Sequence, residues 1–81
     1  MSAVRDRRLA NERFVKMLGQ KIKEIRTEQG LSCSELARRS GHPVSSVHNL
    51  ENGKSLNPGF IFIRNIAKVL NISLDEISKW I

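Results

Sequence analysis

Uncharged hydrogen-bonding side chains gather between residues 44 and 52, in the run VSSVHNLEN. Ser45, Ser46, His48 and Asn49 supply hydroxyl, imidazole and amide groups, which can donate and accept hydrogen bonds. The chemistry that these groups support is recognition of polar groups on a partner. Ser, His and Glu residues are all present, but nothing in their spacing indicates a nucleophile beside its base. We therefore expect a binding protein and not an enzyme.

Three side chains are potential metal ligands: Cys33, His42 and His48. They lack the close pairs that are typical of zinc sites, so we expect no metal, and nothing indicates a cofactor or a small-molecule ligand. Cys33 stands at a predicted helix start, where a lowered thiol pKa would suit a redox sensor. The simpler interpretation is a packed, unreactive thiol, because free cysteine commonly serves as a small apolar residue.

The chain is basic, with 14 Lys and Arg residues against 8 Asp and Glu and a formal net charge of +6. This balance favours a polyanionic partner, either nucleic acid or an acidic membrane surface. A membrane partner is not expected, because no helix pairs a wide apolar face with a lysine-rich one and no apolar run is long enough to span a bilayer. The N-terminus shows no signal peptide and the only cysteine suits a reducing compartment, so we expect a cytoplasmic protein.

Apolar residues at three- and four-residue steps predict a first helix from about Asn11 to Gln29, which Gly30 should end. Its apolar stripe consists of Val15, Leu18, Ile22 and Ile25. Residues 1–10 carry Arg5, Arg7 and Arg8 and are predicted to form a flexible basic arm. The alternative is an arm that lies on a phosphate backbone. Residues 11–81 then form one small domain.

Two short helices are predicted next. The run from Ser32 to Glu35 spells the S-x-x-E capping box, so a second helix should begin at Cys33 and end at Gly41. A third helix should occupy about residues 43–52, because the torsion of Pro43 suits a first helical turn. Val44, Val47 and Leu50 give it a narrow apolar stripe.

The C-terminal third of the chain predicts two more helices. Asn57 and Pro58 are expected as the N-cap and first turn of a fourth helix. A second capping box, from Ser73 to Glu76, predicts a fifth. The apolar positions are Phe60, Ile63, Ile66, Ala67 and Leu70 in the fourth helix and Leu74, Ile77, Trp80 and Ile81 in the fifth. No segment alternates as a half-buried strand would, so the fold class is all-α.

Two short helices joined at a glycine match a helix-turn-helix, whose second helix can enter the roughly 12 Å wide major groove of DNA. The uncharged polar face of the third helix suits contacts with base edges, while positive charge elsewhere suits contacts that position the protein. Further residues at fixed spacing run through the chain. They are Leu18-Gly19, Ile22, Arg26, Gly30-Leu31-Ser32, Glu35-Leu36-Ala37, Gly41, Val47, Glu51, Gly53, Pro58, Ile66-Ala67, Leu70 and Ser73 to Ile77. In these residues the segment from Leu18 to Ile77 resembles the XRE-like helix-turn-helix family of phage repressors and Cro proteins.

The resemblance implies a compact five-helix, lambda-repressor-like domain that binds double-stranded DNA. It implies base contacts by Val44, Ser45, Ser46, His48 and Asn49. It implies backbone-phosphate contacts by Ser32, Cys33, Asn52 and Lys54. Asn49 is the strongest candidate reader, because an amide can bond adenine through two atoms.

Four residues depart from the family pattern at this surface. Cys33 replaces a glutamine at the start of the second helix, and His42 and Pro43 replace an apolar residue and a capping serine in the turn. Val44 replaces a base-reading glutamine, and it can pack on a thymine methyl instead. Glu51 is expected in a structural ion pair with Arg26 or Arg39.

The C-terminal residues Ile77, Trp80 and Ile81 are expected either to complete the core or to form a dimer seam. The resemblance implies a homodimer that binds a palindromic operator as a transcriptional regulator, most simply a repressor. An antitoxin-type autoregulator, a restriction-modification controller and a phage or plasmid repressor are all compatible. The rival interpretation is a protein-interaction module with weak DNA binding.

Overall fold

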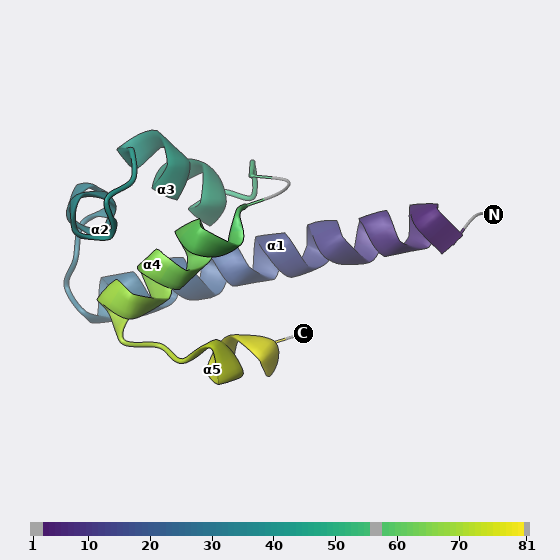
Figure 1. The fold of residues 1–81 in the computed structure, drawn as a ribbon. Helices are drawn as coiled ribbons and strands as arrows, with labels where there is room; N and C mark the ends of the chain where they lie inside the picture. The colour runs from purple at the N-terminus through teal and green to yellow at the C-terminus, as the bar shows by residue number, and fades with distance from the viewer. Residues whose placement is uncertain (1–2, 56–57, 81) are drawn as a thin grey trace.

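The structure, a computed structural model, describes residues 3–55 and 58–80, with side chains from residue 11 onward. Its five helices are α1 (Ala3–Glu28), α2 (Cys33–Ser40), α3 (Val44–Glu51), α4 (Phe60–Leu70) and α5 (Leu74–Ser78) (Figure 1). All regular secondary structure in the described ranges is helical, which confirms the all-α prediction. No helix in these ranges is long and apolar enough to cross a lipid bilayer.

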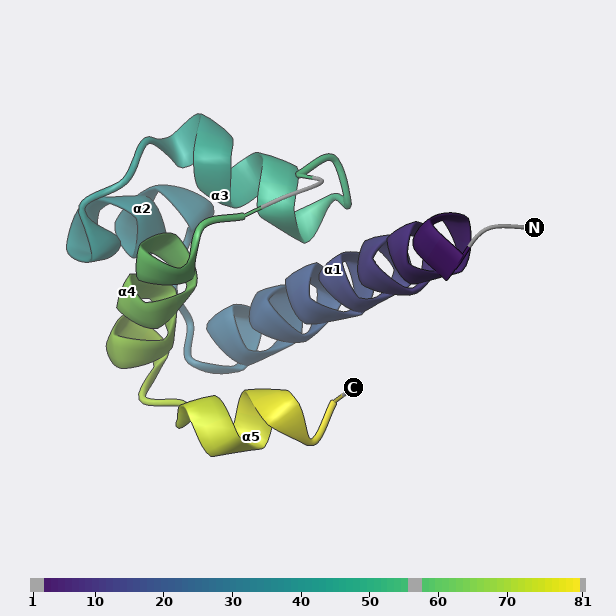
Figure 2. The same ribbon diagram turned by 45° about the vertical axis from the view of Figure 1, so that its right-hand side comes forward.

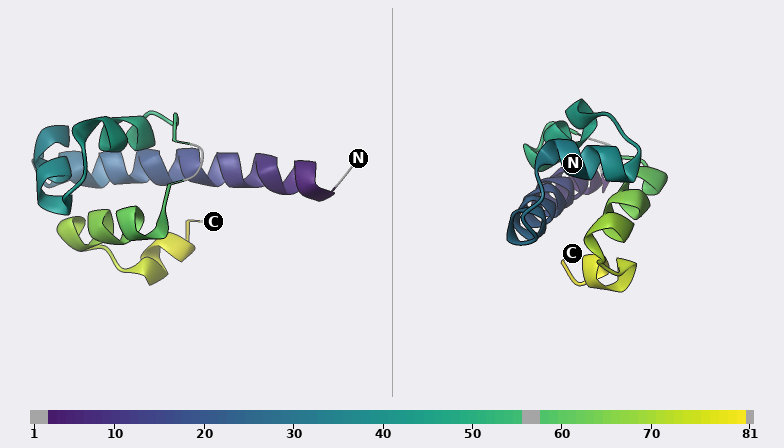
Figure 3. Two further views of the ribbon diagram at one scale, coloured as in Figure 1. Left: turned by 45° about the horizontal axis from the view of Figure 1, so that its top comes forward. Right: turned by 90° about the vertical axis from the view of Figure 1, so that its left-hand side faces the viewer.

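The helices enclose one core. α3 packs against α1 and α2, and α2 packs against α4 (Figure 2). α3 and α5 lie on opposite sides of α1, whose N-terminal part projects beyond the other helices (Figure 3). The buried apolar residues are Val15, Leu18, Ile22, Leu36, Ala37, Val47, Leu50, Ile66, Ala67, Leu70, Ile72 and Ile77. These positions include most of the predicted α1 and α3 stripes, so hydrophobic burial selects this arrangement. Two stripe residues differ: Ile25 is only half-buried, and Val44 at the start of α3 is 49% exposed.

Local signals place several helix ends where the sequence predicts them. The Ser32 hydroxyl accepts from the Glu35 amide at 3.0 Å, and the Glu35 carboxylate accepts from the Ser32 amide at 3.5 Å, so the capping box opens α2. At α5 the Ser73 hydroxyl accepts from the amide of Glu76 at 3.1 Å. These bonds satisfy amides that the first turn of a helix leaves without partners.

Two helices begin two or more residues away from the expected start. α1 begins at Ala3 and not near Asn11, because residues 3–10 are rich in Ala, Arg and Leu and contain neither Gly nor Pro. The division into an arm of residues 1–10 and a domain of residues 11–81 stays a prediction.

α4 begins at Phe60 and not at Pro58, with Gly59 in an extended conformation as its N-cap. Gly59 is a poor helix residue but a favourable N-cap, which explains the later start. The expected cap, Asn57, lies outside the described residues. Phe60 is 67% exposed, so the first residue of the predicted α4 stripe is not in the core.

Candidate nucleic-acid interface

The turn between α2 and α3 is closed by Gly41. Gly41 has φ of 76° and ψ of 27°, a left-handed conformation that costs a residue with a Cβ atom more than it costs glycine. The amide of Gly41 bonds the Arg38 carbonyl at 3.3 Å, and the amide of His42 bonds the Ala37 carbonyl at 3.0 Å. These bonds end α2, as Gly41 predicts. Pro43 is the extended N-cap of α3, which begins one residue later than expected.

His42 fastens this turn to α4. Its Nε2 atom lies 3.1 Å from the side-chain nitrogen of Asn65, within hydrogen-bond distance. Its ring also packs against Phe62, with centroids 4.6 Å apart and planes tilted by 59°. His42, which departs from the family pattern, is therefore still a packed turn residue, and it also forms a polar contact with α4.

The inner side of α3 is closely packed against α1. Val47 and Leu50 are fully buried. At Gly19 in α1, an added Cβ would lie 1.9 Å from the Leu50 carbonyl oxygen and 2.9 Å from its carbon. Because real Cβ atoms do not approach backbone atoms so closely, only glycine permits this distance between the helices.

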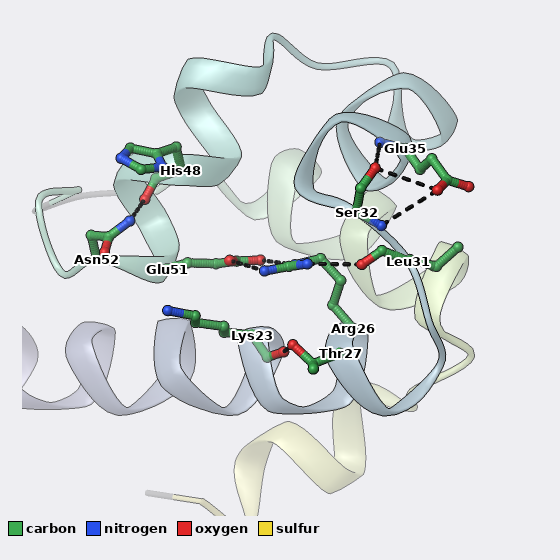
Figure 4. Close-up of polar contacts among 9 residues, drawn as sticks. All are labelled: Lys23, Arg26, Thr27, Leu31, Ser32, Glu35, His48, Glu51 and Asn52. Carbon is green, nitrogen blue, oxygen red and sulfur yellow. Dashed lines mark hydrogen bonds and ion pairs between the residues drawn. The ribbon is translucent and has the colours of Figure 1, made fainter.

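An ion pair completes the junction of α1 with α3 (Figure 4). Arg26 Nε and Nη2 donate to the two carboxylate oxygens of Glu51 at 2.7 and 2.9 Å, and Arg26 Nη1 donates to the Leu31 carbonyl at 2.8 Å. The two side chains are 13% and 3% exposed. The hydrogen bond to Glu51 raises the pKa of Arg26 above its ordinary value, although burial acts the other way. Glu51 is therefore a structural partner of Arg26, one of the two expected arginines.

The outer side of α3 carries the predicted base-contacting residues. Val44, Ser45, His48 and Asn49 are exposed, whereas Ser46 is half-buried at the edge of this face. Residues 44, 45, 48 and 49 lie at helical spacings that share one side of α3. We call these four residues the exposed face of α3. The structure therefore brings four of the five predicted side chains together on one surface.

The predicted phosphate-contacting residues form two groups. Ser32 and Cys33 stand at the start of α2, and Asn52 and Lys54 follow the end of α3. Asn52 is exposed and its amide nitrogen donates to the His48 carbonyl at 2.7 Å, while Lys54 is exposed. Ser32 and Asn52 lie on either side of the pair formed by Arg26 and Glu51 in Figure 4.

Cys33 is half-buried and packs against the core. Burial raises the pKa of its thiol, and the nearby Glu51 carboxylate raises this pKa further. The positive charges of Arg26 and Lys23 lower it by less. A raised pKa disfavours the reactive thiolate, which supports the interpretation of Cys33 as a packed thiol and not a redox sensor.

Three residues of α1 were missed by sequence reasoning. Lys16, Gln20 and Lys23 line a shallow pocket beside the end of α3. They are four and three residues apart, which places them on one side of the helix. This spacing is the sequence feature from which they could have been identified.

The predicted dimer residues have different surroundings. Ile77 is buried in the core, and Trp80 is half-buried and packs against the same core. Ile81 lies outside the described residues. Ile77 therefore completes the core, one of the two roles expected for it, while the dimer seam stays a prediction. Leu74 of α5 is 44% exposed.

The sequence model of the helix-turn-helix family matches residues 22–77. The chain belongs to the XRE-type helix-turn-helix family. Among this family's transcriptional regulators, the chain is 38% identical over 58 residues to SinR of Bacillus subtilis, covering 72% of this chain and 52% of SinR. It is 31% identical over 61 residues to SlrR of the same organism, covering 75% of this chain and 40% of SlrR. The chain thus spans about half the length, or less, of these curated relatives.

Solved helix-turn-helix structures show the same fold. The restriction-modification controller protein C.AhdI from Aeromonas hydrophila superposes with a TM-score of 0.73 and 35% identity, covering 78% of this chain and 94% of that one. The clp gene regulator ClgR from Corynebacterium glutamicum superposes with a TM-score of 0.76 and 19% identity, covering 83% of this chain and 70% of ClgR. At that identity ClgR supports the fold alone. These comparisons confirm the predicted family and fold class.

Proposed function

We propose that this XRE-type helix-turn-helix protein is a sequence-specific DNA-binding transcriptional regulator that acts through α3. The observation that carries the proposal is the exposed face of α3, which lies on a helix whose other side is held against α1. Polar groups that are exposed and held in place suit base edges in a major groove. The relatives, which are named as transcriptional regulators, support the same proposal.

The proposed assembly is a homodimer on a palindromic operator. In such an assembly two α3 helices would lie about 34 Å apart, one turn of DNA, in successive major grooves. Repression by blocking polymerase is the simplest mechanism. The proposed dimer contact uses the surface of α5 and Trp80, and the proposed location is the cytoplasm.

Selection of bound fragments from random DNA tests this proposal. We expect a consensus with two inverted half-sites, because each protomer would read the same bases in opposite directions. Affinity for the selected DNA should fall steeply with salt, because phosphate contacts release counterions. No enriched fragment, or enriched fragments without a consensus, would contradict sequence-specific binding.

The rival proposal is a protein-interaction module with weak DNA binding. It draws support from exposed apolar side chains at the start of α4, where Phe60 and Ile61 are 67% and 63% exposed. The same selection separates the two proposals, because an interaction module would show no operator at any salt concentration.

A further inference from the structure

A shallow pocket of about 380 Å³ lies between α1 and the end of α3. It is lined by Lys16, Gln20 and Lys23 from α1 and by Glu51, Asn52 and Gly53 from the other side. The close approach at Gly19 and the ion pair between Arg26 and Glu51 hold these two walls together. The pocket is therefore a fixed feature of the junction between α1 and α3.

The lining of this pocket is positively charged. Glu51 is its acidic residue, but both carboxylate oxygens accept hydrogen bonds from Arg26. Lys16 and Lys23 form no ion pair within the described ranges. Lys21, on the same helix, lies 3.7 Å from the Glu24 carboxylate instead. Two uncompensated ammonium groups thus face the pocket, beside amide side chains that can donate hydrogen bonds.

Both lysines are directed to the pocket by their surroundings. An added Cβ at Gly53 would lie 3.1 Å from Lys16 Cγ, so the stem of Lys16 lies close to this glycine. Figure 4 shows the Lys23 side chain rising from α1, with its amine near the end of α3 and below Glu51. The two cations therefore approach the pocket from the α1 side.

We propose that this pocket binds a phosphate of the DNA backbone, with Lys16 and Lys23 as its cationic contacts. The inference rests on the proposed DNA binding and adds a contact that the family resemblance did not supply. The pocket shares Asn52 with the predicted phosphate contacts, and Lys54 follows two residues later. A duplex held by α3 would present backbone phosphates at this edge.

Backbone phosphate is favoured over free phosphate by the exposure of the site. Lys16, Gln20 and Lys23 are all exposed, and water competes strongly with exposed charges for an isolated anion. A phosphate that belongs to a bound duplex is already positioned, and neutralising it releases counterions. The pocket thus contributes to affinity and register without reading sequence.

The substitution Lys23→Gln tests the pocket, with Lys21→Gln as the matched control on the same helix. Because each protomer of the proposed dimer loses one phosphate contact, the slope of log K against log salt should become less steep by about 1.8. The ratio of mutant to wild-type Kd should therefore shrink about twelvefold between 50 and 200 mM salt. Lys21→Gln should keep the wild-type slope, and both variants should select the wild-type consensus. Lys16→Gln should behave as Lys23→Gln does.

Ethylation interference locates the contact on DNA. With wild-type protein, we expect ethylation of one additional backbone phosphate in each half-site to weaken binding. With Lys23→Gln that position should lose its interference, while positions contacted elsewhere keep theirs.

The outcomes separate this inference from the proposed function. If wild-type protein binds its operator with steep salt dependence but Lys23→Gln and Lys21→Gln share one slope, the pocket is not a phosphate contact and the function stands. If wild-type protein selects no DNA, both fall. Titration with inorganic phosphate, followed by amide NMR shifts, completes the test. Shifts at the pocket that Lys23→Gln removes, with an unchanged DNA slope, would assign the site to a free anion and overturn the proposal.

Discussion

The two sides of α3 differ in what they contact. The inner side, with Val47, Leu50 and Glu51, is buried against α1 and α2, and its position is fixed by backbone approach and a paired charge. The outer side carries the exposed side chains of Val44, Ser45, His48 and Asn49. One helix of eight residues therefore separates two kinds of requirement, because stability depends on one side and recognition on the other. Substitutions on the inner side should change the free energy of unfolding, and substitutions on the outer side should change DNA binding.

The largest effect is expected at the ion pair on the inner side. Glu51→Ala would leave the mostly buried Arg26 guanidinium without its carboxylate, which typically costs about 3 to 4 kcal/mol of unfolding free energy. Urea unfolding at fixed protein concentration measures the loss. The control is Glu24→Ala, which removes an exposed pair and should cost less than about 0.5 kcal/mol. Equal losses in the two variants would show that burial does not matter here.

The second effect concerns the approach of α1 to α3. Gly19→Ala would place a Cβ 1.9 Å from the Leu50 carbonyl oxygen, so the helices must separate. We expect a loss of about 2 to 3 kcal/mol, despite the better helix propensity of alanine. The matched control is Gly59→Ala, where an added Cβ meets nothing within 4 Å and only the N-cap preference is lost, at most about 1 kcal/mol. An unchanged urea midpoint for Gly19→Ala would refute the close contact.

A substitution on the outer side should weaken DNA binding and leave the stability of the fold nearly unchanged. Asn49→Ala should weaken operator binding by roughly 1 to 3 kcal/mol and relax one base position, because an amide can read adenine through two hydrogen bonds. Its unfolding free energy should change by less than about 0.5 kcal/mol, since Asn49 is exposed. Asn11→Ala, an exposed amide on α1, is the control and should keep the consensus. If Asn49→Ala selects the wild-type consensus, Asn49 does not read a base.

The smallest effect is expected just beyond the end of α3. Lys54→Ala should make the salt dependence of operator binding less steep by about 1 for each protomer bound and leave sequence preference unchanged, because a phosphate contact carries no base information. Lys68→Ala, which removes an exposed charge from the last turn of α4, should leave the slope unchanged. Lost discrimination in Lys54→Ala would instead place Lys54 at a base.

Short-range signals in the sequence predicted much of the fold. The capping bonds at Ser32 and Ser73 and the left-handed Gly41 depend on residues within four positions, so sequence alone identifies them. The start of α1 was misjudged because residues 3–10 lack an apolar stripe yet favour a helix. The exposure of Phe60 was misjudged because the periodicity of a helix does not show which of its apolar residues other helices cover.

The candidate site was predicted less completely, because its geometry depends on distant parts of the chain. The contact at Gly19 joins residues 31 positions apart in sequence, and Arg26 and Glu51 are 25 positions apart. The link between His42 and Asn65 also needs α4 in place. Residue types indicated that Glu51 would be paired, but only the fold selects Arg26 over Arg39, which lies 3.6 Å from Glu35 instead.

The glycine at position 19 has a consequence for engineering this protein. Because Gly19 sets the height of α3 above α1, a combinatorial library that retargets the protein can vary positions 44, 45, 48 and 49 while Gly19, Arg26 and Glu51 stay constant. Variants from such a library should keep one backbone scaffold, so differences in the selected DNA can be assigned to the varied side chains. A library that also varied position 19 would mix changes in side-chain identity with changes in helix placement.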